Sequence, residues 1–129
     1  LQIIEGTGGV TVIDDAFNSN PEGAAAALEV LDAMPGNQKV VVTPGMIELG
    51  PLQHEANEKF GRHAADVADK LIVVAKTNRA AIQSGASSNG GAEVVTVDSL
   101  AEAQRHLEGA LRPGDVVLFE NDLPDQYEG

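Results

Sequence analysis

Residues 10–21 read VTVIDDAFNSNP, and this stretch decides the fold because it joins a strand pattern directly to the start of a helix. Val10–Ile13 is a run of aliphatic and β-branched residues, which favours a buried strand. Asn20 and Pro21 have the order of an N-cap followed by proline at the first helical position. The stretch therefore predicts a strand, a short polar loop and a helix.

The same alternation continues along the rest of the chain. Aliphatic runs recur at residues 39–43, 70–75, 93–97 and 115–119, and apolar residues repeat at helical spacing over residues 24–34, 56–67 and 100–111. Apolar strands separated by helices are typical of a parallel sheet covered on both faces. Gly6–Gly9 has the composition of a hairpin turn, so Gln2–Glu5 is expected to be an antiparallel edge strand. We predict one α/β domain over residues 1–129, Rossmann-like and three-layered, with about six mostly parallel strands.

Composition and charge exclude several classes of function. The chain has 129 residues, of which 43% are hydrophobic, and its net charge of -12 opposes binding to nucleic acids or anionic membranes. The absence of cysteine excludes disulfides and cysteine-ligated zinc, and no apolar run has the length of a membrane span. These features fit a cytoplasmic protein. The start at Leu1 without methionine predicts an excerpt of a longer polypeptide, and the low-complexity segment Ser84–Gly91 predicts a mobile surface loop.

Polar residues follow the first core strand, where ligands bind in open α/β sheets. Asp14, Asp15, Asn18 and Asn20 place carboxylates and carboxamides between the strand and the helix start. Carboxylates oppose a bare phosphate, whereas they accept hydrogen bonds from sugar hydroxyls or bind a cation. Alternatively, Asn20 only caps the helix and the two acids form a solvated turn. The spacing alone leaves both interpretations open.

The other strand ends carry weaker signals. The loop over residues 43–51 contains Gly45 and Glu48 and is compatible with an ordinary strand-to-helix connection, with Met46 and Leu49 packed inward. Thr77 or Asn78 is most simply a helix cap, and residues 120–122 bring further acids to the same edge of the sheet.

Signatures of complete catalytic sites are missing from the sequence. The three histidines lack metal-ligand spacing, and exposure on helices is the simpler expectation for each; they are His54, His63 and His106. No lysine follows a glycine, so the sequence contains no P-loop for ATP phosphates. No catalytic triad can be assembled, and we predict no metal site in this chain.

The motif at residues 14–21 resembles the C-terminal domain of the Mur ligases, which build the peptidoglycan stem peptide. It is most similar to the branch that adds D-alanyl-D-alanine, whose signature is Asp-Asp-x-Tyr-Asn-x-Asn-Pro. The segment Gly45–Gly50 (GMIELG) and Gly61 fall at spacings similar to that branch. The resemblance covers roughly residues 1–120.

This resemblance implies the last domain of a three-domain, ATP-dependent amide-bond ligase. In such enzymes a central domain holds the P-loop and Mg²⁺, an acyl phosphate forms on a UDP-muramoyl-peptide, and the amine of an amino acid or dipeptide attacks it. The C-terminal domain closes over the site and is inactive alone. Carried over by position, Asp15 would hold the ribose hydroxyls of ATP, Asn18 and Asn20 would line the nucleotide and substrate cleft, and Asp14 would support them.

Further cleft residues implied by position are Phe17, Ser19, Gly45 and Glu48, of which Phe17 stands where the family usually has tyrosine. The family's late Lys-Gly-Ser-like segment is replaced here by residues 120–125 (ENDLPD). Two other classes remain as alternatives, a receiver-like signalling domain and a noncatalytic interaction module. A receiver would need a phosphate-accepting aspartate after its third strand and a lysine after its fifth, where this chain has residues 43–45 or 76–77 and Glu120.

Overall fold

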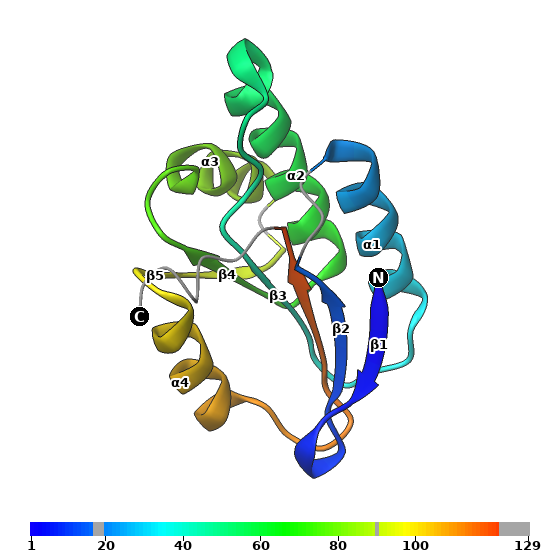
Figure 1. The fold of residues 1–129 in the computed structure, drawn as a ribbon. Helices are drawn as coiled ribbons and strands as arrows, with labels where there is room; N and C mark the ends of the chain where they lie inside the picture. The colour runs from blue at the N-terminus through cyan, green and yellow to red at the C-terminus, as the bar shows by residue number, and fades with distance from the viewer. Residues whose placement is uncertain (17–19, 90, 122–129) are drawn as a thin grey trace.

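A computed structural model describes residues 1–16, 20–89 and 91–121 of the chain (Figure 1). The strands are β1 (Gln2–Glu5), β2 (Thr11–Asp15), β3 (Lys39–Thr43), β4 (Lys70–Val74), β5 (Glu93–Val97) and β6 (Val116–Glu120). The helices are α1 (Pro21–Ala33), α2 (Gln53–Val67), α3 (Arg79–Asn89) and α4 (Leu100–Ala110), with short 3₁₀ turns at Thr7–Gly9 and Gly50–Leu52.

The six strands form one sheet in the order β1-β2-β6-β3-β4-β5. β1 pairs antiparallel with β2, and the other neighbouring strands pair in parallel. This arrangement confirms the predicted mostly parallel sheet with one antiparallel edge strand. The last strand in the described part of the chain, β6, lies between β2 and β3, which brings three strand ends from distant parts of the sequence side by side.

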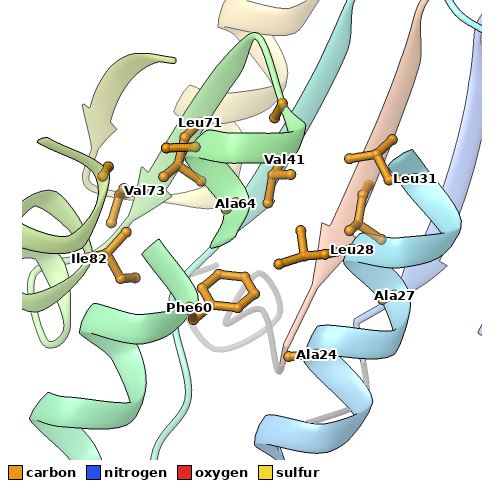
Figure 2. Close-up of a cluster of buried hydrophobic side chains, with 14 of the residues drawn as sticks. Ala24, Ala27, Leu28, Leu31, Val41, Phe60, Ala64, Leu71, Val73 and Ile82 are labelled. Carbon is orange, nitrogen blue, oxygen red and sulfur yellow. The ribbon is translucent and has the colours of Figure 1, made fainter. Parts of the chain in front are cut away.

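Two apolar clusters cover the two faces of the sheet. On one face, α1, α2 and α3 pack on strand residues such as Val41, Leu71 and Val73 (Figure 2), together with Ile13 and Leu118. On the other, α4 packs on the alternate residues of the same strands, including Val42 and Val117. Because side chains alternate along a strand, each residue's position decides which helical layer it meets.

Helix starts agree with the capping pattern of the sequence. The side chain of Asn20 accepts a hydrogen bond of 2.7 Å from the backbone N–H of Gly23, and Pro21 occupies the first turn of α1. The Ser99 hydroxyl accepts a bond of 3.2 Å from the backbone N–H of Glu102 at the start of α4. These contacts satisfy amide groups that the first helical turn leaves without intrahelical partners.

The prediction of a surface loop at Ser84–Gly91 is wrong, because residues 84–89 form the second half of α3. Glycine permits a close crossing of α3 and α2. A Cβ on Gly85 would overlap the backbone oxygen of Glu58, and one on Gly61 would overlap that of Ile82. The small residues therefore bring two helix backbones together and do not mark a loop.

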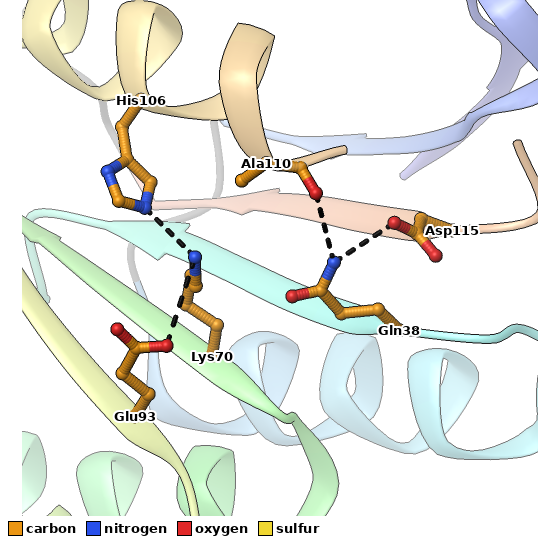
Figure 3. Close-up of polar contacts among 6 residues, drawn as sticks. All are labelled: Gln38, Lys70, Glu93, His106, Ala110 and Asp115. Carbon is orange, nitrogen blue, oxygen red and sulfur yellow. Dashed lines mark hydrogen bonds and ion pairs between the residues drawn. The ribbon is translucent and has the colours of Figure 1, made fainter. Parts of the chain in front are cut away.

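The amino ends of the strands are held by polar contacts (Figure 3). The Lys70 ammonium lies 2.9 Å from Nε2 of His106, and Gln38 donates a bond of 3.0 Å to the buried carboxylate of Asp115. The expectation of exposed histidines holds for His54 only, since His63 and His106 are half-buried. None of the helices in the described ranges is long and apolar enough to span a membrane.

Candidate functional site at the carboxyl ends of the strands

Asp14 and Asp15 lie on opposite faces of the sheet. The sequence pattern ends the strand at Ile13, but β2 continues through Asp15, so the side chains of the two acids alternate. Asp14 shares its face with Val12 on the α4 side, and its carboxylate accepts a bond of 3.1 Å from the backbone N–H of Ala16. Asp15 shares its face with Ile13 under α1. The two acids therefore do not act as one pair toward a ligand.

The neighbour of Asp15 is Glu120. The two residues are register partners in the parallel pair of β2 and β6, and both follow core residues of the same face, Ile13 and Leu118. The Asp15 side chain is 9% exposed and Glu120 is fully buried. The structure thus joins one predicted site residue to an acid from the far end of the sequence.

Burial raises the pKa of the Glu120 carboxyl to about 10, and hydrogen bonding and charge repulsion from Asp15 act in the same direction. The backbone N–H of Asn121 and the amino group of Leu1 oppose the shift in this pKa. At neutral pH Glu120 is therefore an uncharged acid that can donate a hydrogen bond.

Thr43 and Asn121 connect the ends of β3 and β6. The Thr43 hydroxyl donates a 2.8 Å hydrogen bond to the Asn121 side-chain oxygen and accepts one of 3.0 Å from the backbone N–H of Gly45. Asn121 has a φ of 72°, a left-handed conformation that asparagine adopts more readily than most residues. The loop after β3 is thereby fixed to the strand that carries Glu120.

Two buried asparagines hold the same loop from the other side. Asn57 accepts a bond of 2.8 Å from the N–H of Met46 and donates one of 2.9 Å to its carbonyl oxygen. Asn78 donates to the carbonyl oxygens of Pro44 and Met46 at 3.0 and 3.2 Å. The Asn78 side chain thus braces the loop, where the sequence suggested a helix cap. Gly45 has a φ of 81°, and a Cβ there would lie 2.7 Å from the Asn57 side-chain oxygen.

The remaining predicted site residues are separated by the fold. Asn20 caps α1 through its side-chain oxygen, as the capping interpretation predicted. Gly45 is buried and Glu48 is exposed with a φ of 63°. Met46 and Leu49 pack on the core, which confirms the inward packing predicted for them. Phe17, Asn18 and Ser19 lie outside the described residues.

A groove of about 500 Å³ runs between α1 and α2, beside the start of α1. Its apolar lining includes Met46 and Phe60, and its charged lining includes Glu22 and Lys59. Among the described residues, Gly45 and Glu48 are not part of the groove lining. The groove therefore adjoins both sequence motifs, with Met46 as the residue of the second motif that reaches it.

Sequence reasoning missed the roles of Glu120, Thr43, Asn57 and Asn78. Each stands near the end of a strand pattern or on a helix, and only the strand order shows that these segments meet. The sequence signal for Glu120 was an acid at the end of an apolar strand, at the carboxyl edge of the sheet where the sequence had already predicted ligand binding. Within the described parts of the chain, no group of three acidic, histidine or cysteine side chains is placed to hold a metal ion.

Known proteins are similar to this chain in sequence and in fold. The family model described as "Mur ligase, glutamate ligase domain" matches residues 1–120. The UDP-N-acetylmuramoyl-tripeptide–D-alanyl-D-alanine ligase of Mycobacterium leprae is 33% identical over 136 residues, covering 92% of this chain and 26% of that protein.

Two solved structures are similar as well. MurF ligase from Thermotoga maritima, in complex with ADP, has a TM-score of 0.77 and 28% identity, covering 92% of this chain and 26% of its own. MurF from Acinetobacter baumannii has a TM-score of 0.78 and 25% identity, covering 95% of this chain and 27% of its own. The chain spans about a quarter of the length of these relatives.

Proposed function

The chain belongs to the Mur ligase family, matching its glutamate ligase domain, and from this we propose that it is the C-terminal domain of an ATP-dependent amide-bond ligase of peptidoglycan synthesis. Its acceptor is a UDP-muramoyl-peptide and its amine substrate is an amino acid or dipeptide, with D-alanyl-D-alanine favoured by the names of the relatives. The enzyme works in the cytoplasm, where these precursors and ATP occur.

We propose that Asp15 accepts hydrogen bonds from the ribose hydroxyls of ATP. The observation that supports this most strongly is its position at the carboxyl end of β2, at the sheet edge where open α/β folds bind ligands. A carboxylate can accept a bond from each hydroxyl of a ribose. Asn18 and Asn20 contribute to the cleft in this proposal, and Asp14, on the opposite face, supports the turn through Ala16.

The phosphates of ATP and Mg²⁺ are held by the central domain in this proposal, because the sequence here has no P-loop. ATP then bridges two domains and favours the closed arrangement through its higher affinity for that state. Closure also keeps water away from the acyl phosphate, which would otherwise be hydrolysed. The groove between α1 and α2 lies beside this cleft and is a candidate path for the substrate.

The proposal is tested by Asp15→Ala in the full-length protein, with ADP release measured as a function of ATP concentration. Losing a hydrogen bond from a charged group costs about 1.5–3 kcal/mol, so KM for ATP is expected to rise roughly tenfold or more. With 2′,3′-dideoxy-ATP, which lacks the hydroxyls, wild type and variant are expected to have the same KM.

Two controls accompany this measurement. Asp69→Ala changes an exposed acid at the amino end of β4 and is expected to leave KM for ATP unchanged. The 129-residue chain alone is expected to form no amide bond, since it supplies only part of the cleft. An Asp15→Ala variant with unchanged KM for ATP would show that Asp15 does not contact the ribose and only ends strand β2.

A further inference from the structure

Glu120 is a buried acid whose place in the site calls for an explanation. It is fully buried at the end of β6, and neither of its carboxyl oxygens has a well-formed hydrogen bond among the described residues. A buried, ionised carboxylate without donors is strongly unfavourable. An acid is therefore retained where an apolar residue would continue the core.

The position of Glu120 beside Asp15 resolves this. An ionised Glu120 and an ionised Asp15 are both acceptors, so neither can bond to the other. One proton on Glu120 supplies the missing donor, and the Asp15 carboxylate, its register partner on β2, becomes the acceptor. Carboxyl-to-carboxylate hydrogen bonds of this kind are charge-assisted and strong.

We propose that Glu120 is the positioning residue for Asp15: as a neutral carboxylic acid it donates the hydrogen bond that fixes the Asp15 carboxylate at the ligand-binding edge of the sheet. The inference rests on the proposed function of Asp15 and deepens it. One oxygen of Asp15 is held by Glu120, which turns the carboxylate toward the ribose hydroxyls.

The surroundings of the pair favour the neutral form of Glu120. Burial and the Asp15 charge raise the pKa of the Glu120 carboxyl. The charged group that acts in the opposite direction is the amino group of Leu1 on the neighbouring edge strand, 3.5 Å from Oδ1 of Asp15. That amino group is a neutral amide wherever a residue precedes Leu1, so the pairing of the two acids does not depend on it. On the other side of Glu120 the end of β3 presents Thr43, which is uncharged.

The protonation state is measured first, without nucleotide. Carbon-13 NMR of the Glu120 carboxyl in this chain is expected to show a protonated acid at pH 7, with ionisation only in the alkaline range. Asp15→Asn removes the neighbouring charge and is expected to shift the Glu120 transition to lower pH. An ionised Glu120 at pH 7 overturns the proposal whatever the nucleotide site is.

The positioning role is measured next in the full-length protein. Glu120→Gln keeps a donor beside Asp15 and is expected to stay within about twofold of the wild-type KM for ATP, whereas Glu120→Leu, which removes the donor, is expected to raise it about tenfold. Both variants are expected to keep kcat within about twofold and to match the wild type with 2′,3′-dideoxy-ATP. Equal effects of Gln and Leu, or an equal effect on the dideoxy nucleotide, overturn the positioning role.

The two proposals fail in different ways. If Asp15→Ala raises KM for ATP and Glu120→Leu does not, the role of Glu120 is wrong and that of Asp15 stands. If Asp15→Ala has no effect, both are overturned. An alkaline rise in KM for ATP that is present in the wild type and absent in Glu120→Gln supports the donor role, because only the wild type has a proton to lose.

Discussion

At the scale of single residues, the uncharged Glu120 makes stability depend on pH in an unusual direction for an acid. Its pKa is about 10 in the folded protein against 4.5 as the ordinary value, so between these pH values the folded state holds one more proton than the unfolded state. The free energy of unfolding therefore falls as pH rises through this window, by at most about 1.4 kcal/mol per pH unit from this group.

Glu120→Gln removes this dependence and is expected to be more stable than the wild type at pH 8, with the difference shrinking toward pH 5. Urea unfolding at several pH values measures this difference in the free energy of unfolding between variant and wild type. Glu108→Gln, on the exposed side of α4, is the matched control and is expected to follow the wild-type curve. Parallel curves for wild type and Glu120→Gln would show that Glu120 is ionised in the folded protein.

At the scale of secondary-structure elements, the crossing of α2 and α3 depends on glycine. Gly85→Ala would force the added methyl group against the backbone of Glu58, and overpacking of this kind costs about 1–3 kcal/mol. Gly109→Ala, in α4 with no atom within 4 Å of the added Cβ, is expected to stabilise by up to about 1 kcal/mol through helix propensity. If the crossing is as close as described, thermal unfolding shows a lower Tm than the wild type for Gly85→Ala and a higher Tm for Gly109→Ala.

The elements themselves were largely predictable, and the exceptions have physical causes. Apolar runs and capping residues predicted the strands and three of the helices, because burial and capping leave local patterns. The second half of α3 was mistaken for a loop, since Ser, Gly and Asn have low helix propensity and tertiary packing against α2 outweighs it. The end of β2 was placed at Ile13, because two acids rarely continue a strand.

The candidate site was predictable only in part. The sequence predicted which edge of the sheet carries Asp14 and Asp15, and it predicted the capping role of Asn20. It did not pair Asp15 with Glu120, because that contact depends on β6 lying beside β2, and strand order leaves no local pattern. The asparagines that hold Met46 come from within α2 and from the residue before α3, and the spacing of residues in the sequence does not show that they meet the same loop.

At the scale of the whole molecule, the division of ATP contacts between domains predicts a change of shape. Small-angle scattering of the full-length protein is expected to show a smaller radius of gyration with a nonhydrolysable ATP analogue and the muramoyl acceptor than without them. Asp15→Ala is expected to reduce this compaction at a limiting analogue concentration, since it weakens one side of the bridge. The same radius in both conditions, with wild-type behaviour of Asp15→Ala, would contradict the bridging model.

The alternating faces of β2 also have a consequence for how this fold can diverge. Insertion of a single residue within the strand would move each acid to the opposite face of the sheet. The side chain of Asp14 would then point toward α1 and that of Asp15 toward α4. Insertion of two residues would restore them. In homologous chains, one can count the residues from the last core residue of this strand to each acid. Whether that number is odd or even tells which acid shares a face with Glu120, even where the two motifs have the same sequence.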